Sequence, residues 1–475
     1  MLFGVDKIPA DLVDALRSGR MRPADAPGAV PLPALTLMIR FADEGRTQWQ
    51  ITARRATGVP SSRVAPTPWQ EDAAFAPAFD TFWRLSRTPI EKAEDADCLD
   101  GAAQRLGDAL AGALTADEAA FLVAAARGDP PPPLLVIESD DDRVLALPWE
   151  LIRLDGRFAV RAGRLDVARS VPTTGAPELS PPSAPLSLLV NVSAPAGSGL
   201  DYERESYVVV RALHEHLGVV INEMGEVDDL IDGLRGDPPP IGVHFSGHGG
   251  PGTLVFEDEY GEARPVEIDA LITEIRRRGP ERLPRFFFLA CCHGGDAPSS
   301  SAGGLPAAAT ALHRDGITQV VGYFGPVLDE LSTRAERAFY AELAAGRRTR
   351  DAVRAARQEM SSAAVAGGRT VRRDAGTSAT AGLLPYGWAQ MVLYQRGAGH
   401  PLGTRIVAGT GVAIETTERR TVEAYPGSRS QILKAGFVGR RKEMHALRRD
   451  LGKATICMWC RALAASARAP FAAKR

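Results

Sequence analysis

Two histidines and two cysteines stand where apolar strands of the chain are expected to end. The stretch IGVHFSGHGG (residues 241–250) runs from an apolar strand into glycines around His248. A second stretch, RFFFLACCHGG (residues 285–295), runs from another apolar strand into Cys291 and Cys292. A thiolate is a strong nucleophile, and a nearby histidine lowers the pKa of the thiol and can protonate a leaving amine. These residue types predict nucleophilic catalysis by a Cys–His pair.

Position along the strand separates the two histidines but does not separate the two cysteines. His244 falls inside the strand, where we expect a buried core histidine, whereas His248 lies between glycines in a turn and is the predicted base. Cys291 directly follows the strand and is the predicted nucleophile. Cys292 is either a buried packing residue or a spectator thiol, and its spacing does not decide between it and Cys291.

The same two turns offer donors for an oxyanion. Glycine lets backbone N–H groups approach a substrate closely, and a tetrahedral intermediate needs donors that are already in place. We therefore expect the oxyanion hole to consist of the backbone N–H groups of Gly249 and Cys291.

Alternating strands and helices must bring these turns together. From residue 186 onward, continuous apolar strands alternate with amphipathic helices, which predicts an α/β fold with a mostly parallel sheet covered by helices on both faces. The carboxyl ends of parallel strands meet at one edge of a sheet, so both turns should lie at that edge. The Pro- and Ser-rich stretch 170–185 marks a domain boundary ahead of this region.

Composition excludes several classes of function. The 475-residue chain has 56 basic and 58 acidic side chains and a net charge of -2, so we expect neither a nucleic acid nor a membrane as partner. Five cysteines are too few for a disulfide scaffold, and the N-terminus lacks a secretion signal, which predicts a cytoplasmic location. The spacing in CMWC (Cys457 to Cys460) has no second pair, so we expect no metal and no cofactor.

Several segments together resemble one family. HFSGHGG and FFFLACCHGG, with ALPWELI, VARSVP around Arg169 and PYGWAQMVLY, resemble the CHAT family of bacterial caspase-like cysteine peptidases, which is related to separase. The resemblance implies a caspase-like three-layer fold in residues 186–396, preceded by a degenerate pseudo-peptidase half in residues 1–180. It also implies that a dyad of His248 and Cys291 cleaves protein substrates, and it points to bacterial stress or antiphage signalling.

The resemblance leaves two functions open besides a thiol endopeptidase. The first is a catalytically silent caspase-like scaffold that docks other proteins, and the second is a hydrolase or acyltransferase that uses the dyad on small molecules. Asp329 resembles an acidic position that lines the pocket for a basic residue in separase-like relatives, where a carboxylate would bind Arg or Lys. It could equally cap the helix that begins there.

The C-terminal part resembles something different. After a linker in residues 397–435, the stretch GFVGRRKEMHALRRDL (residues 436–451) resembles the opening of the nucleotide-binding module in STAND-type signalling ATPases. The phosphate loop departs from the pattern, because no hydroxyl residue directly follows Lys453 and Leu447 occupies the leading glycine position. We therefore expect residues 436–475 to be a truncated module start, and a regulatory protein or NTPase module to act as a partner.

Overall fold

The computed structural model describes most of the chain between residues 33 and 396. The described residues are 33–55, 58–87, 90, 92–128, 131–172, 187–198, 202–213, 218–222, 224–236, 239–250, 252–279, 283–293, 305–325, 329–373, 385–396, 402, 414–416 and 445–446. We call residues 33–172 the N-terminal half and residues 187–396 the C-terminal half.

The N-terminal half combines strands with a group of helices. Its strands are β1 (Ala34–Phe41), β2 (Gln48–Arg55), β3 (Ser61–Pro66), β4 (Leu134–Glu138), β5 (Arg153–Leu154), β6 (Arg157–Phe158) and β7 (Asp166–Ser170). Its helices are α2 (Pro68–Glu71), α3 (Phe75–Ser86), α4 (Ala93–Ala111), α5 (Ala116–Ala126), α6 (Asp142–Leu145) and the 3-10 helix η1 (Trp149–Leu151).

The C-terminal half shows the predicted alternation of strands and helices. Its strands are β8 (Ser187–Val192), β9 (Gly218–Ile221), β10 (Gly242–Gly250), β11 (Thr253–Glu257), β12 (Ala263–Glu267), β13 (Phe286–His293), β14 (Gln319–Tyr323) and β15 (Met391–Gln395). Its helices are α7 (Tyr202–Leu213), α8 (Val227–Leu234), α9 (Ile268–Arg278), α10 (Leu305–Arg314), α11 (Asp329–Ala344), α12 (Thr349–Arg373) and α13 (Gly387–Gln390). A further strand, β16 (Ile414–Thr416), follows.

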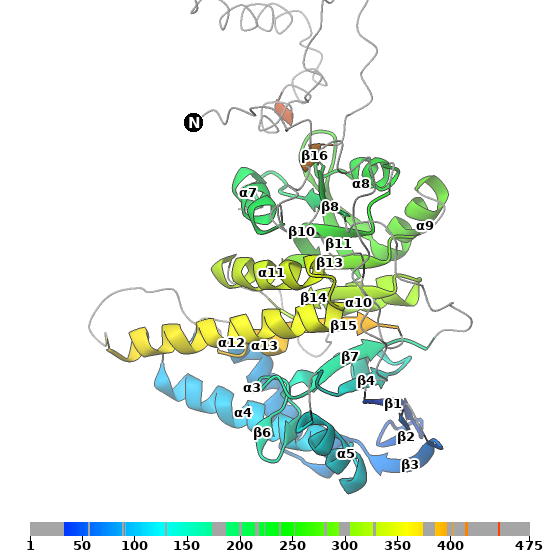
Figure 1. Cartoon of the computed structure of the whole chain (residues 1–475), viewed down its shortest axis with the longest axis vertical. Coiled ribbons are helices and arrows are strands. Elements are labelled where there is room, and N and C mark those ends of the chain that lie inside the picture. Colours follow the sequence, from blue (N-terminus) through cyan, green and yellow to red (C-terminus); the bar gives the residue numbers. More distant parts are fainter. Residues whose placement is uncertain are drawn as a thin grey trace, which may run out of the picture.

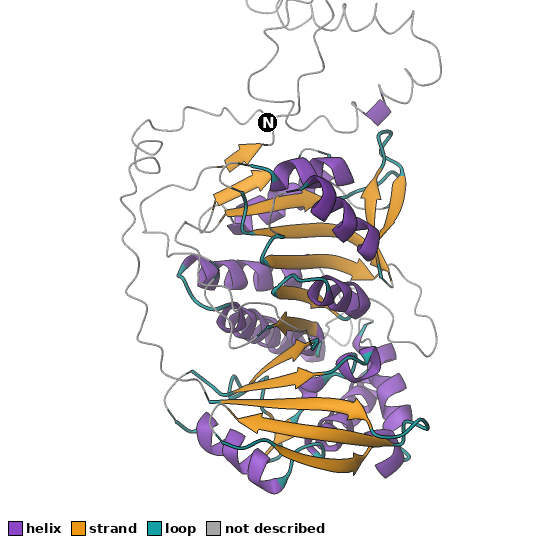
Figure 2. Ribbon diagram, turned by 90° about the vertical axis from the view of Figure 1, so that its right-hand side faces the viewer, coloured by secondary structure: helices purple, strands orange, loops and turns teal. Residues whose placement is uncertain are grey.

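One sheet of 14 strands runs through both halves (Figures 1 and 2). Its order is β16-β9-β8-β10-β13-β14-β15-β7-β4-β1-β2-β3, and β11 and β12 extend it beside β10. Strands β9, β8, β10, β13 and β14 are parallel, β15 is antiparallel to β14, and β15, β7, β4 and β1 are parallel again. The predicted α/β class with a mostly parallel sheet is confirmed.

Helices cover both faces of the sheet in the C-terminal half. Figure 1 shows α7, α11 and α12 on one side and α8, α9 and α10 on the other. Helix α9 illustrates why they pack, because Ile268, Leu271, Ile272 and Ile275 form a buried stripe at helical spacing. Between the layers, β13 is apolar throughout residues 286–289, all of which are 0% exposed. A strand covered on both faces needs such a continuous apolar run.

The halves join where β15 meets β7. The pairing rests on one register pair, Tyr394 with Arg169. The predicted domain boundary after residue 180 falls in 173–186, outside the described residues, so the division into residues 1–180 and 186–396 stays a prediction. Most of the predicted linker (397–435) and module start (436–475) also lie outside the described residues.

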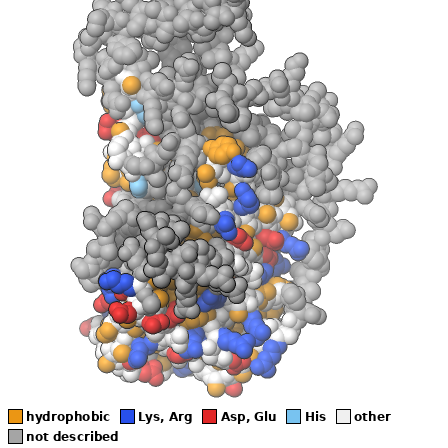
Figure 3. Space-filling model, turned by 90° about the vertical axis from the view of Figure 1, so that its left-hand side faces the viewer, with side chains coloured by type: hydrophobic (Ala, Val, Ile, Leu, Met, Phe, Trp, Pro, Cys, Tyr) orange, Lys and Arg blue, Asp and Glu red, His pale blue; other side chains and the backbone are white. Residues whose placement is uncertain are grey.

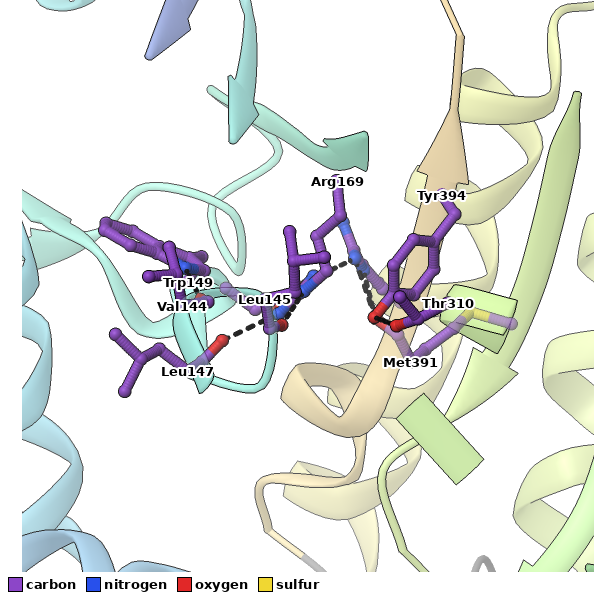
Figure 4. Close-up of polar contacts among 10 residues, drawn as sticks. Val144, Leu145, Leu147, Trp149, Arg169, Thr310, Met391 and Tyr394 are labelled. Carbon is purple, nitrogen blue, oxygen red and sulfur yellow. Dashed lines mark hydrogen bonds and ion pairs between the residues drawn. The ribbon is translucent and has the colours of Figure 1, made fainter. Parts of the chain in front are cut away.

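A buried ion cluster lies at this junction. The Arg169 guanidinium donates to both carboxylate oxygens of Glu150, at 2.6 and 2.8 Å. It also donates to the carbonyls of Leu145 and Leu147, at 2.7 and 2.8 Å (Figure 4). Arg169 and Glu150 are both 0% exposed. The hydrogen bonds between Arg169 and Glu150 are therefore shielded from water. Burying the two charges costs free energy, and only well-aligned hydrogen bonds offset that cost.

Glu150 also accepts a hydrogen bond from the C-terminal half. Arg357 of α12 donates to Glu150 Oε1 at 2.8 Å and to the carbonyl of Met391, the first residue of β15. The guanidinium of Arg169 additionally lies 4.8 Å from the ring centroid of Phe324, just beyond β14. One carboxylate thus connects elements of both halves.

The described surface carries charges of both signs. In Figure 3, which views the side on which α12 projects in Figure 1, basic and acidic side chains are intermixed over the described part. Among the described residues, no single helix is long and apolar enough to cross a membrane, and α4 and α5 meet that criterion only as a pair bent by 111°.

Candidate active site

The two strands that carry the predicted dyad are neighbours in the sheet. β10 and β13 run parallel, with register pairs from Gly242–Phe286 to Gly249–His293. Their carboxyl ends therefore lie at the same edge. Within this register, Gly247 is opposite Cys291 and His248 is opposite Cys292.

Both strands extend further than the sequence predicts. Residues 247–250 were expected to form a turn, but β10 continues to Gly250, and β13 continues through Cys291 and Cys292 to His293. The physical reason is an additional partner strand, because β11 pairs antiparallel with residues 248–250. Gly249 is consequently a strand residue, opposite Leu254 on one side and His293 on the other.

His248 is half-buried and held by a main-chain group. Its Nε2 lies 3.2 Å from the carbonyl oxygen of Ser198. A carbonyl oxygen can only accept a hydrogen bond, so Nε2 must carry the proton, and in the neutral ring Nδ1 then has the lone pair. The contact selects the tautomer in which Nδ1 carries the lone pair.

The segment that supplies this carbonyl crosses close to β10. The Ser193 N–H donates to the carbonyl of Ser246 at 2.8 Å. A Cβ at Gly247 would lie 3.1 Å from the Ser193 oxygen and 3.2 Å from its Cβ, which is tighter than ordinary contact. Glycine at 247 therefore lets residues 193–198 approach the strand just before His248.

Cys291 is buried and is not disulfide-bonded. It is 2% exposed and belongs to the hydrophobic core. Because successive side chains of a strand point to opposite faces, regular alternation directs Cys291, which is opposite Gly247, away from the face of His248. A contact between the sulfur and the imidazole therefore requires the thiol to turn across the end of the sheet.

His244 has the core role that the sequence predicts. It is 0% exposed, its Nδ1 lies 2.8 Å from the Tyr340 hydroxyl, and its ring stacks on Phe288 at 5.2 Å. Burial lowers the pKa of His244 to about 3, so it is neutral at physiological pH.

Other predicted site features fall partly outside the described residues. Asp329 is the first residue of α11, but its side chain is not among those described, so its roles as pocket carboxylate and as helix cap both stay predictions. The side chain of Cys292 and the Cys457–Cys460 motif also lie outside the described residues. Within the described part of the chain, no group of three or more His, Cys, Asp or Glu side chains is arranged to hold a metal ion.

Sequence reasoning did not find the Ser198 carbonyl. Every residue type presents the same carbonyl, so no letter in the sequence marks the one that holds a histidine. Only the tertiary path of residues 193–198 reveals it.

A family model, the CHAT domain, matches residues 100–396, which is more than half of the chain. The chain belongs to the CHAT-domain family. The match spans the Glu150–Arg169 cluster of the N-terminal half and all of the C-terminal half, so this CHAT domain contains both sides of the junction.

The chain is weakly similar to solved structures of separase. Two crystal structures of the Saccharomyces cerevisiae separase–securin complex align with TM-scores of 0.42 and 0.37 and identities of 12% and 13%. The alignments cover 86% and 81% of this chain but only 31% and 30% of the separase chains, so this chain spans about a third of their length. No curated protein sequence matches the chain.

Proposed function

We propose that this CHAT protein is a cysteine endopeptidase that hydrolyses peptide bonds of protein substrates through Cys291 and His248. The observation that carries the proposal is the hydrogen bond from His248 Nε2 to Ser198 at the edge where β13 ends. Because Nε2 is occupied, Nδ1 of His248 is left to accept a proton. His248 is on β10, and the thiol of Cys291 is on the neighbouring strand β13.

The reaction follows from these groups. With the thiol turned across the end of the sheet, Nδ1 of His248 takes the proton of Cys291. The thiolate then attacks the substrate carbonyl to form a tetrahedral oxyanion, which the N–H groups of Gly249 and Cys291 would stabilise. The imidazolium then protonates the leaving amine as the C–N bond breaks, which leaves an acyl-enzyme. Water, deprotonated by His248, hydrolyses the thioester and regenerates the thiol.

Several features of the peptidase are further parts of the proposal. Asp329 would select a basic residue before the cleaved bond through a charge-assisted contact. The enzyme would act in bacterial stress or defence signalling in the cytoplasm, under control of a regulatory protein or a STAND-type module. Family resemblance supports the specificity, the signalling role and the regulatory partner, and the small number of cysteines supports the location. Substrate profiling of the protein and its Asp329→Asn variant would test the preference for Arg or Lys.

The alternative is a catalytically silent caspase-like scaffold. One observation favours it, namely the 2% exposure of Cys291, because a nucleophile must reach its substrate. The scaffold predicts no proteolysis and no preferential modification of Cys291 by a thiol-reactive peptide.

Single replacements of the two adjacent cysteines separate these cases. We expect Cys291→Ala to abolish cleavage of a peptide library, a loss of at least about 1000-fold, because the nucleophile is removed. Cys292→Ala should retain cleavage. Mass spectrometry of the products provides the measurement, and circular dichroism checks that both variants fold. Cleavage by Cys291→Ala that disappears only in Cys292→Ala would assign the reaction to the second thiol.

A further inference from the structure

A buried carboxylate supports the segment that holds His248. Glu257, the last residue of β11, is 1% exposed. Its Oε1 accepts a hydrogen bond of 2.6 Å from the N–H of Ala194. A buried carboxylate needs such donors, and charge-assisted bonds of this length are among the stronger hydrogen bonds in proteins.

The same segment is attached on both sides of Ala194. Ser193 donates its N–H to β10, and the Ala196 N–H donates to the carbonyl of Gly261 at 2.8 Å. Two residues later, the Ser198 carbonyl accepts the proton of His248 Nε2. Glu257 therefore fixes the segment near its start, between the contact of Ser193 with β10 and the Ser198 carbonyl that holds the ring.

The turn that follows Glu257 is itself well ordered. Oδ1 of Asp258 accepts the N–H groups of Tyr260 and Glu262, at 2.8 and 2.9 Å, and Gly261 has φ +80. Hydrogen bonds of this kind close a turn without help from the rest of the protein. The turn is thus a firm support for Ala196.

A residue from the C-terminal region reaches this support. His445 is 6% exposed, and its Nδ1 lies 3.6 Å from Glu257 Oε2. A Cβ at Gly261 would overlap the imidazole ring of His445, so glycine makes room for it. One oxygen of Glu257 thus faces the segment that holds His248, and the other faces a residue 188 positions later (445 minus 257).

We propose that Glu257 is a positioning residue for His248, and that it couples the contact with His445 to the orientation of the catalytic imidazole. This inference rests on the proposed cysteine peptidase. Packing of His445 against Glu257 and Gly261 holds the carboxylate toward Ala194, which holds the Ser198 carbonyl against Nε2. Loss of the His445 contact therefore loosens the imidazole without touching either member of the dyad.

Alkylation of Cys291 by iodoacetamide tests the coupling without a substrate. The rate is measured from pH 5 to 9, and tandem mass spectrometry locates the label. We expect Glu257→Gln to lower the rate near neutral pH by about fivefold, because a neutral acceptor holds Ala194 less firmly than a carboxylate. The pH profile should also move toward that of His248→Ala. Glu259→Gln, an exposed residue of the same turn, is the matched control and should leave rate and profile unchanged.

His445→Ala keeps the buried carboxylate of Glu257, so it can test the coupling even if Glu257→Gln does not fold. It should change the profile in the same direction by about twofold to threefold, and the double variant should resemble Glu257→Gln alone, because the two residues act in series. Equal profiles for the unaltered protein, Glu257→Gln and His445→Ala would overturn the coupling. If the unaltered protein and His248→Ala react alike, the dyad itself is absent, and the proposed function fails instead.

Discussion

His248 is attached to the main chain through one ring nitrogen, which leaves the lone pair on the other. The bond from Nε2 to the Ser198 carbonyl fixes the ring plane and the tautomer together. The acceptor is a neutral carbonyl, which orients the ring without placing a negative charge beside it. His248 is therefore positioned mainly by geometry.

Gly247 provides a test of this geometry. In Gly247→Ala the new methyl group would press on Ser193, and the 193–198 segment would have to move outward by a few tenths of an ångström. We expect kcat/KM for a peptide substrate to fall by about tenfold or more, because small displacements of a catalytic group are costly.

The control for this variant is Gly101→Ala in helix α4, where a Cβ meets nothing within 4 Å. Alanine is favoured over glycine in a helix, so this change should leave activity intact and raise the melting temperature slightly. Normal activity in Gly247→Ala would show that the close approach of Ser193 has no bearing on the site.

At the residue scale, the sequence could predict which side chains are buried but not which groups they contact. Alternation along IGVHFSGHGG correctly placed His244 in the core. Alternation points Cys291 and Cys292 to opposite faces, but the choice between them requires the register with the His248 strand, which the sequence does not show. The Ser198 carbonyl that holds His248 lies in a loop 50 residues earlier in the chain, so no local pattern reveals it.

At the element scale, the packing of α12 and β15 against the N-terminal half involves one carboxylate, that of Glu150. Glu150 accepts from Arg169 of β7 and from Arg357 of α12, and all three side chains are at most 3% exposed. Burial lowers the pKa of Arg357, and the charge of Glu150 opposes that shift. Removing the carboxylate would leave two buried guanidinium groups without their counter-ion.

Glu150→Ala is therefore expected to lower the free energy of unfolding by about 3–5 kcal/mol, the usual cost of breaking a buried ion pair from one side. Denaturant unfolding followed by tryptophan fluorescence measures the change. Glu94→Ala, an exposed residue of α4, should alter the free energy by less than about 0.5 kcal/mol. A Glu150→Ala variant as stable as this control would mean that the cluster is neutral for stability.

Element prediction succeeded where periodicity was strong and failed where pairing decided the outcome. The apolar strand within residues 285–295 and the amphipathic helix α9 are visible in the sequence. Glycines around His248 indicated a turn, but β11 returns alongside them and keeps them extended. A partner strand that arrives after the glycines cannot be inferred from the glycines themselves.

The whole molecule should lose stability in acid. Burial lowers the pKa of both His244 and His313 to about 3. Their pKa in the unfolded chain is near 6.5. Below that pH the unfolded state therefore binds more protons than the folded state, which favours unfolding. The stability is complete above about pH 6.5 and is lost progressively as the pH falls toward 3.

From pH 7 to 4.5 each of these histidines should cost about 2.5 kcal/mol of unfolding free energy. His244→Asn, whose amide can replace Nδ1 as partner of Tyr340, should reduce the acid loss by that amount. Urea titrations at the two pH values measure it. An unchanged difference between the two pH values would show that His244 takes up its proton without unfolding.

The union of both halves in one sheet could not be predicted. It depends on Tyr394 meeting Arg169, two residues 225 positions apart (394 minus 169). The proline-rich stretch indicated a boundary, and the family resemblance implied a related half on each side of it. Which of their strands would be adjacent is decided by packing across the junction, and no local signal encodes it.

The acceptor at position 198 has one more consequence. Since it belongs to the peptide backbone, replacing the serine with almost any other amino acid would leave the imidazole held as before. Alanine scanning would therefore show no effect at Ser198, although the reaction would rely on its carbonyl. Only a change in the path of the main chain would remove this hydrogen bond.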